Sequence, residues 1–599
     1  MTRRLLALAF TAFVALTLWA QEAQKREMRT VWIATVSNID WPQTRGTGTA
    51  TINKQKKQLT DLLDGFVKAN MNSVCLQVRP MADALYKSSY EPWSSYLTGT
   101  RGQDPGWDPL AFAVEECHKR GLEINAWVNP YRFSNSSGND CNTAIDQNLK
   151  NSGILMQVGN RIVFNPALKA SRDHLLKVCK EMIQNYDIDG IIFDDYFYPG
   201  GGTPEDSSAP DYQLYTQSNS GMSIGDWRRA NVNQMVKDMW DMVQATKPYV
   251  KFSIGPAGVA GQRSTSATKH GVVPVDEYCR ASDWQYTTIY SDPLAWLEEG
   301  TIDYISPQLY WKTNHTTNPF GPLTNWWSYI AEHFGRHHYA SHNIYFMEKT
   351  NTKADWDEIL QQIRYSRQYN RQNAPGVNFY SAKYIDGPTC KGFADYLSQT
   401  LFTHKALEPA MPWHSKTNYD APANLAYSGG TLSWTGVNKK LVRYSVYAVP
   451  LTVTLDEAQS QAFDGIKSDY LVGVTYTPSF KLDASLQSGY WYAVCVVDGW
   501  NNEFAPAFYN LATEYADKVT LVSPIAGAAA SWNQQFAWTA ADGATYELQI
   551  SDDATFGNVL SRRKQINTIP TTISLGGLAL GQNYYWRVGT LQPFRLVTR

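Results

Sequence analysis

The chain has 599 residues, which is too many for one ordinary hydrophobic core, so roughly two to four domains are expected. Its formal net charge of -2 and its pI of about 6.6 exclude an electrostatic basis for binding nucleic acid. Aromatic residues make up 13% of the chain, and such rings are common in proteins that bind carbohydrate, although they also fill cores.

The amino terminus has the pattern of a signal peptide, which we assign to residues 1–20. Thr2-Arg3-Arg4 supplies positive charge, residues 5–18 are apolar, and Ala20 or Ala23 suits cleavage. The apolar stretch is too short to favour a membrane span, and no cysteine lies nearby to carry a lipid anchor. We therefore expect export to the periplasm or cell envelope of a bacterium.

From about residue 26 onward, apolar strand patterns alternate with amphipathic helical patterns. The expected strands are residues 31–35, 73–80, 124–130, 191–193, 252–258, 303–311, 343–349 and 376–382. The expected helices are residues 54–69, 109–119, 172–185, 226–246, 292–299, 325–334, 354–369 and 391–401. Eight such units predict an α/β fold, a (β/α)8 TIM barrel over residues 26–407. A doubly wound open sheet is the alternative, but no glycine-rich phosphate loop follows an early strand.

After residue 407 the helical patterns end. Residues 408–420 are rich in Pro and polar side chains and are predicted to be a linker. Residues 421–514 contain short alternating strands without helical crossovers, which predicts an all-β sandwich of fibronectin type III kind. The pattern restarts over residues 515–599, where a second, smaller sandwich is expected. Such modules serve as spacers or as binding platforms for glycan.

The seven cysteines are scattered and show no metal-ligand spacing. Several lie in apolar runs, as Cys75 and Cys495 do, so buried thiols are expected, while a disulfide in an exported protein stays open. HExxH and P-loop patterns are absent from the sequence, and a GxSxG match, GMSIG (221–225), does not directly follow an expected strand as a nucleophile elbow would. The sequence therefore indicates neither a metal nor another cofactor.

The fourth strand carries the strongest functional signal, DGIIFDDYFYP (189–199). Asp194 and Asp195 stand where the apolar run ends, and Tyr196 follows them. Unpaired charge at the end of a buried strand costs several kcal/mol. Carboxylates transfer protons or stabilise an oxocarbenium-like centre, and neighbouring rings stack on sugars. The alternative is an Asp pair that is solvated in a loop or paired with Arg.

Residues at the ends of the other strands converge on the same face of a barrel. The candidates that we expect to bind substrate are Arg79, Asn129, Arg132, Tyr196, Gln308, Tyr310 and Trp311. The arginines could hold sugar hydroxyls or an acidic substituent, lower the pKa of an Asp, or only form ion pairs. The amides suit vicinal hydroxyls or an acetamido group but could instead cap loops, and the rings are stacking surfaces.

The catalytic candidates are Asp194, Asp195 and Asp83. Side chains alternate along a strand, so Asp194 and Tyr196 share one face. If Phe193 packs against the surrounding helices, Asp194 faces the pocket. We therefore assign proton transfer or nucleophilic attack to Asp194, with Asp83 and then Asp195 as the second carboxylate. The separation that distinguishes retaining from inverting mechanisms does not follow from sequence.

Five ordered blocks resemble the glycoside hydrolase family-10-like proteins, which include bacterial envelope glycan hydrolases. They are REMRTVWIATVSNIDWP (26–42), QVRPMADALYKSSYEPWSSYLTG (77–99), NAWVNPYR (125–132), DGIIFDDYFYP (189–199) and IDYISPQLYW (302–311). The resemblance covers residues 26–401 and implies a barrel that hydrolyses glycosidic bonds. Members of the group are associated with bacterial cell-wall glycan, particularly strands stripped of their peptides. The paired Glu residues of true family-10 xylanases are not recognisable.

The fourth-strand block is also similar to the DxxDxDxE motif of family-18 chitinases. Aligned on Asp189, Asp194 matches the third Asp, but Ile192 stands at the second and Tyr196 replaces the catalytic Glu. The chitinase acid therefore cannot be carried over, and cleavage assisted by a substrate N-acetyl group remains open.

Together these observations predict an exported glycoside hydrolase acting on an N-acetylhexosamine-containing glycan, with peptidoglycan strands lacking stem peptides as the expected substrate. The alternatives are a hydrolase of another dietary or host polysaccharide and a non-catalytic glycan-binding envelope protein. The expected partner is the glycan, without nucleic acid and without a membrane span. The oligomeric state does not follow from the sequence.

Overall fold

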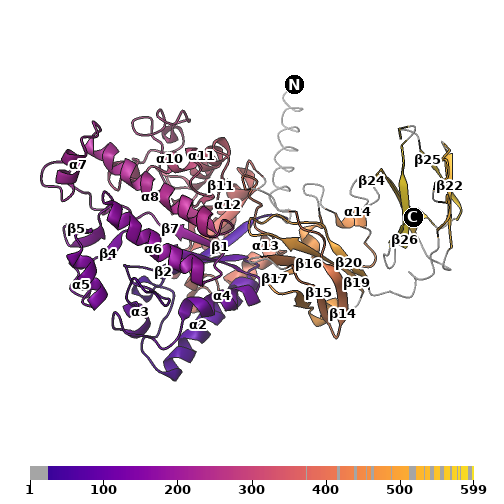
Figure 1. Cartoon of the computed structure of the whole chain (residues 1–599), viewed down its shortest axis with the longest axis horizontal. Helices are drawn as coiled ribbons and strands as arrows, with labels where there is room; N and C mark the ends of the chain where they lie inside the picture. Colours follow the sequence, from indigo (N-terminus) through magenta and orange to yellow (C-terminus); the bar gives the residue numbers. More distant parts are fainter. Residues whose placement is uncertain are drawn as a thin grey trace. The chain divides into compact units, whose positions relative to one another are not determined.

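The computed structural model describes residues 24–599 apart from 373, 415–417, 438–441, 454, 460–464, 488, 511–520, 526, 532, 540–545, 553–558, 567–568, 576–577, 580–581, 591–595 and 599. The chain divides into two compact units (Figure 1). The first comprises residues up to 417 with 440–443 and 497–502, and the second comprises the remainder. The predicted signal peptide, residues 1–20, lies outside the described residues.

The first unit is built on one parallel sheet. Its strands are β1 (Met28–Ile33), β2 (Ser73–Arg79), β3 (Glu123–Val128), β7 (Gly190–Phe193), β8 (Lys251–Ile254), β9 (Tyr304–Ile305), β10 (Gln308–Leu309), β11 (His337–His338), β12 (Ala340–Asn343) and β13 (Gly376–Tyr380). Their order is β10-β12-β13-β1-β2-β3-β7-β8-β9-β11. The sixth strand is interrupted between β9 and β10 and the seventh between β11 and β12. Because β9 pairs with β11 and β10 with β12, the sheet closes on itself. The predicted (β/α)8 barrel is confirmed.

Amphipathic helices cover the outside of this sheet (Figure 1). Those that follow the barrel strands are α2 (Thr49–Lys68), α4 (Pro109–Lys119), α6 (Lys169–Asn185), α8 (Ile224–Thr246), α10 (Pro293–Glu298), α11 (Phe320–His333), α12 (Lys353–Gln368) and α13 (Phe393–Thr400). Shorter helices are α3 (Ser95–Thr98), α5 (Ala144–Asn151), α7 (Tyr212–Ser218) and α9 (Trp284–Thr287). In α2 the buried Leu59, Leu63 and Phe66 recur at helical spacing, which is why this segment packs as a helix.

The seventh strand lies elsewhere than predicted. Residues 343–349 were expected to form it, but Tyr345–Glu348 is a 3-10 helix, and the strand is formed by β11 and β12. The true strand is polar and contains buried histidines, and burial lowers the pKa of both His338 and His342 to about 3. A search for apolar runs misses a strand of this composition, since its burial is decided by the barrel around it.

One insertion at the carboxyl end of β3 was not predicted. It contains β4 (Arg132–Ser134), β5 (Leu155–Val158) and β6 (Arg161–Phe164), which form a three-stranded antiparallel sheet in the order β4-β6-β5. Arg132 pairs with Val163 across this sheet. We call it the hairpin sheet, and it stands beside the carboxyl end of the barrel.

Side chains of β7 alternate between two cores, as a strand requires. Ile192 packs in the barrel interior with Trp32, Cys75 and Trp127, among others. Phe193 belongs to the core between sheet and helices, where its ring meets Phe252 at 5.1 Å. Because Phe193 packs against the helices, the next residue, Asp194, points to the inside of the barrel, as the sequence analysis expected for this case.

The C-terminal region is all-β, as expected. The first pair of sheets has the orders β14-β15-β18 and β17-β16-β19-β20, and the second pair has β21-β22-β25 and β24-β23-β26-β27. Their bounds are β14 (Ala423–Ser428), β15 (Thr431–Thr435), β16 (Arg443–Pro450), β17 (Leu471–Thr475), β18 (Ser479–Lys481), β19 (Tyr490–Val497), β20 (Ala507–Asn510), β21 (Leu521–Ser523), β22 (Asn533–Trp538), β23 (Tyr546–Ser551), β24 (Val559–Ile566), β25 (Thr571–Ser574), β26 (Tyr585–Thr590) and β27 (Leu596–Thr598); the short helix α14 (Leu455–Ala458) lies between them. A fibronectin type III relationship and the boundaries at 421, 514 and 515 stay predictions.

The cysteines, the membrane-span prediction and the predicted linker can each be compared with the structure. All seven cysteines are buried free thiols. Within the part of the chain that the structure describes, helices long and apolar enough to cross a membrane are absent. Trp413, in the segment predicted as a linker, donates its indole N–H to Asp303 of the barrel at 2.9 Å.

A buried charge cluster joins the start of β1 to α12. Glu27 accepts from Arg367 Nε at 2.7 Å and from Arg29 Nε at 2.7 Å, and all three side chains are at most 2% exposed. The two guanidinium groups hold the pKa of Glu27 below its ordinary value in spite of burial, which acts in the opposite direction.

We expect Glu27→Gln to lower the stability of the barrel by about 3–5 kcal/mol, because it leaves two buried guanidinium groups without their counter-charge. The measurement is urea denaturation followed by tryptophan fluorescence. Asp357→Asn, which removes one half of an exposed pair with Lys353, is the matched control and should leave the midpoint in place. Equal midpoints for the two variants would contradict the importance of this cluster.

Candidate active site

The acidic pair lies at the carboxyl end of β7, where the loops of a barrel gather their functional groups. Asp194 is 4% exposed and Asp195 is 8% exposed, so neither is a solvated loop residue. Neither carboxylate has an ion-pair partner within 4.0 Å among the described residues. The structure therefore supports neither of the alternatives, an Asp pair solvated in a loop or an Asp pair bonded to Arg.

Asp194 is held by neutral donors from two segments. Asn129, directly after β3, donates its side-chain N–H to Asp194 Oδ2, and the Tyr196 backbone N–H donates to Oδ1 at 3.4 Å. The pKa of Asp194 is raised, because burial outweighs the lowering by the charge of Arg132, the Tyr196 N–H and the side chains of Trp127 and Asn129. These donors favour the ionised form of Asp194.

The orientation of Asn129 is fixed by Gln77 of β2. Gln77 Oε1 accepts the backbone N–H of Thr35 at 2.9 Å and of Val36 at 2.8 Å. Its amide nitrogen must therefore donate, and it does so to Asn129 Oδ1 at 2.7 Å. Since Asn129 Oδ1 accepts this hydrogen bond from Gln77, the amide nitrogen of Asn129 is directed to Asp194.

The pKa of Asp195 is raised as well. Burial and the adjacent charge of Asp194 raise the pKa of Asp195 to about 7, against weaker lowering by Gln308 and Arg132. Its Oδ1 atom is buried and lacks a hydrogen-bond partner among the described residues. A proton on this carboxyl group avoids the cost of an unsatisfied buried charge. The different hydrogen-bond partners of the two groups therefore favour the proton on Asp195, and such unequal pairs serve as acid and base in many hydrolases.

Aromatic rings surround the pair. Tyr196 is 43% exposed, and Tyr310 stacks on Tyr380 with ring centroids 5.5 Å apart. The charges of both Asp residues contribute to raising the pKa of Tyr310 well above its ordinary value, chiefly an effect of burial, so this ring lies near the acids. Trp311 is half-buried over Gly258, where a Cβ atom would lie only 2.6 Å from its ring. A larger residue at 258 would displace Trp311.

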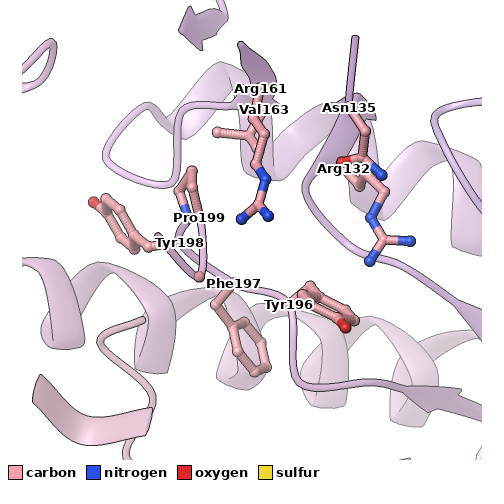
Figure 2. A pocket seen from close by; sticks show the side chains of 9 residues that line it. Arg132, Asn135, Arg161, Val163, Tyr196, Phe197, Tyr198 and Pro199 are labelled. Carbon is pink, nitrogen blue, oxygen red and sulfur yellow. The ribbon is translucent and has the colours of Figure 1, made fainter. Parts of the chain in front are cut away.

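A cavity of about 130 Å³ opens beside the acids (Figure 2). Its walls are Arg132, Asn135, Arg161 and Val163 of the hairpin-sheet insertion and residues 196–200 after β7. The Arg132 guanidinium lies 4.3 Å from the centre of the Tyr196 ring. Asp194 and Asp195 do not line this cavity. Tyr196, which follows them in sequence, and Arg132, whose charge acts on both, are the lining residues that connect the cavity to the acids.

Of the predicted site residues, Arg132 and Tyr196 line this cavity, and Arg79 and Asp83 are engaged in ion pairs elsewhere. Arg79 is fully buried and donates two hydrogen bonds to the Glu91 carboxylate, from Nε to Oε2 at 2.7 Å and from Nη2 to Oε1 at 2.5 Å. It also donates to the backbone oxygen of Asn129, so it supports the loop that carries this residue. Of the alternatives weighed for Arg79, this geometry favours ion pairing.

Asp83 is not brought to the acidic pair. It accepts the Met81 backbone N–H at 2.8 Å and lies 3.5 Å from an Arg101 nitrogen, and burial raises its pKa. The second carboxyl group beside Asp194 is therefore its neighbour Asp195. The catalytic and binding roles of the named residues stay predictions.

Sequence reasoning missed Gln77, Trp127, Arg161 and Tyr380. Gln77 and Trp127 lie inside β2 and β3, whereas the sequence candidates were taken from the ends of the strands. A signal did exist for Arg161, because Gly159-Asn160 is a turn dipeptide between two short alternating runs. Clusters of His, Cys, Asp and Glu able to hold a metal ion are absent from the described part of the chain.

A (β/α)8 barrel with a buried carboxyl pair and exposed aromatic rings at its carboxyl end defines the class of barrel hydrolases that act on sugars. A model of the family described as glycosyl hydrolase-like 10 matches residues 27–357. The chain belongs to this family, and it is a glycoside hydrolase.

Relatives agree with this assignment. The glycosyl hydrolase YngK of Bacillus subtilis (strain 168) is 38% identical over 431 residues, which cover 69% of this chain and 80% of that protein. The glycosyl hydrolase DigH of Escherichia coli (strain K12) is 31% identical over 352 residues, which cover 56% of this chain and 77% of that protein. Among solved structures, the PgaB (BpsB) glycoside hydrolase domain from Bordetella bronchiseptica has a TM-score of 0.41 at 11% identity and covers 62% of this chain and 98% of that chain.

We expect Gln77→Glu to reduce kcat by roughly 10- to 100-fold and to move the acid limb of the pH–rate profile upward. One oxygen of a Glu at this position would still accept the Thr35 and Val36 N–H groups. The other would face Asn129 Oδ1, so Asn129 would turn over, present its oxygen to Asp194 and raise the pKa of Asp194.

The matched control is Gln55→Glu, which also places a carboxylate at a buried Gln, one bonded to the Thr44 and Leu97 carbonyl oxygens. It should lower stability without shifting the pH profile. An unshifted profile in Gln77→Glu would refute the proposed hydrogen-bond chain.

Asp195→Asn should stabilise the folded protein at pH 8 by about 4 kcal/mol, since the pKa of Asp195 is raised from 3.8 to about 7 in the folded state and each pKa unit corresponds to about 1.4 kcal/mol. For wild type, stability therefore falls as pH rises from about 4 to about 7, and the variant avoids this loss. Below pH 4 the two proteins should coincide. Thermal denaturation at both pH values measures this, and the exposed Asp173→Asn is the control. A gain of the same size at pH 4 and pH 8 would show that Asp195 is not the protonated group.

Proposed function

We propose that this protein is an exported hydrolase of an N-acetylhexosamine-containing glycan and that its substrate is peptidoglycan strands lacking stem peptides. The observation that carries the chemical part is the buried pair at the end of β7, in which Asn129 and the Tyr196 N–H favour an ionised Asp194 while Asp195 has a pKa of about 7. The amino-terminal pattern supports export, and the resemblance to envelope glycan hydrolases supports the choice of glycan.

Asp195 acts as the proton donor in this proposal. Its proton passes to the glycosidic oxygen as the bond from that oxygen to the anomeric carbon breaks. The positive charge that develops on the sugar ring is stabilised by the Asp194 carboxylate, through direct attack or by orienting the substrate N-acetyl oxygen. Water then adds its hydroxyl to the anomeric carbon and returns a proton to Asp195, so the enzyme is regenerated.

The sugar rings bind against aromatic side chains. Tyr196, Tyr310 and Trp311 offer faces and edges near the acids, and Gln308 supplies an amide from the end of β10. Gln308 already donates to the Gly255 carbonyl oxygen at 3.0 Å, which fixes its side chain beside Asp195. A rigid amide at this point suits an acetamido group or a pair of hydroxyls.

The test is digestion of peptide-free peptidoglycan strands by wild type, Asp194→Asn and Asp195→Asn, with soluble fragments measured by mass spectrometry. We expect each substitution to reduce the rate by roughly 10²- to 10⁴-fold, because each removes a group that acts in the transition state. Asp173→Asn, on the outer face of α6, should retain the wild-type rate.

Equal release of fragments by wild type and both active-site variants would exclude this site. If peptide-free strands are not cleaved but a dietary or host glycan in a parallel panel is, the substrate assignment fails while the glycosidase assignment stands.

A further inference from the structure

Two arginines of the hairpin-sheet insertion converge on one small cavity next to the acids. Arg132 is half-buried and Arg161 is exposed, and both guanidinium groups are directed toward the segment that carries Tyr196 (Figure 2). Arg161 Nη1 would lie 3.7 Å from a Cβ atom placed on Gly200, so it reaches across to the opposite wall.

Neither arginine forms an ion pair with a carboxylate of the described residues. Within the described residues, both Arg132 and Arg161 lack a carboxylate oxygen within 4.0 Å. Buried arginines of the same barrel behave differently, since Arg79 pairs with Glu91 at 2.5 Å and Arg228 with Asp211 at 2.6 Å. Two like charges at one cavity repel each other, so this arrangement lowers stability unless a ligand neutralises it.

The shape and chemistry of the cavity point to a planar anion. Guanidinium groups bind carboxylates with two parallel hydrogen bonds, and Asn135 adds an amide at the same wall. A volume of about 130 Å³ accommodates a small substituent of a sugar and not a further chain of residues. Arg132 also lowers the pKa of both Asp194 and Asp195, so it stands between this cavity and the acids.

We propose that Arg132 and Arg161 form a subsite for a carboxylate carried by a sugar ring next to the scissile bond. This inference rests on the proposed function for its choice of substrate. In peptidoglycan the carboxylate is that of the lactyl ether of muramic acid, which is free only after the stem peptide has been removed. An attached peptide converts it to an uncharged amide and adds bulk, so the subsite selects strands without peptides.

The first test is binding. Calorimetric titration of the full chain with N-acetylmuramic acid and with N-acetylglucosamine compares two sugars that differ in the lactyl carboxylate. We expect wild type to bind the acidic sugar at least 10-fold more tightly, and Arg161→Gln to abolish that preference. The control is Arg371→Gln, which also removes one positive charge. Arg371 precedes β13, at the opposite end of the barrel, and lies 3.7 Å from Glu332. This variant should keep the preference for the acidic sugar.

The second test is cleavage of peptide-free strands, either intact or with their carboxyl groups converted to methyl amides. Wild type should cleave the amidated strands at least 10-fold less efficiently, through KM, and Arg161→Gln should cleave both strands with one similar KM. The subsite is overturned if Arg161→Gln prefers the acidic sugar over N-acetylglucosamine, and the intact strands over the amidated strands, to the same extent as wild type does.

A polymer of alternating uronic acid and N-acetylhexosamine separates the two sources of a carboxylate. If this polymer is cleaved in an Arg161-dependent manner and the muramic acid strands are not, the carboxylate subsite stands and its source is a uronic acid. If no strand is cleaved but the acidic sugar still binds through Arg161, the subsite stands and the proposed function fails.

Discussion

Two adjacent carboxyl groups buried at the end of one strand cannot both be ionised without a large electrostatic cost, and this constraint governs the site. The protein resolves it by treating the two groups unequally. Asp194 receives the amide of Asn129 and a backbone N–H, whereas Asp195 is left with a buried oxygen that lacks a donor. The result is that a proton is held more readily by Asp195 than by Asp194 within one dipeptide.

The barrel supplies what this inequality requires. Asn129 follows β3 and is oriented by Gln77 on β2, which in turn is oriented by backbone groups that follow β1. Neighbouring strands of a parallel barrel are thus linked side chain to side chain, up to the acid on β7. Arg79 adds support by holding the Asn129 carbonyl oxygen while its own charge is balanced by Glu91. These buried polar residues position Asn129 and, through it, Asp194.

The proposed specificity determinant lies on a different part of the fold from the acids. The barrel strands position the acids, while the hairpin sheet inserted after β3 contributes Arg132 and Arg161, which form no ion pair with a carboxylate among the described residues. Insertions at the carboxyl end of a barrel can vary without disturbing the strands, so a change of substrate needs only a change in such a loop. The proposed carboxylate subsite is an instance of this separation.

The sequence by itself determined the barrel and the position of its acids, because alternating apolar patterns and the run IIFDD are local properties of neighbouring residues. It also indicated Asn129 as a strand-end residue. It failed at the seventh strand, where buried histidines replace apolar residues, and it missed Gln77 and Arg161. Tertiary structure alone decided that Arg79 pairs with Glu91, that Asp83 faces Arg101, and that the pKa of Asp195 is raised. The physical reason is that ion pairing and proton affinity depend on burial and on charges that the fold brings together from distant parts of the chain.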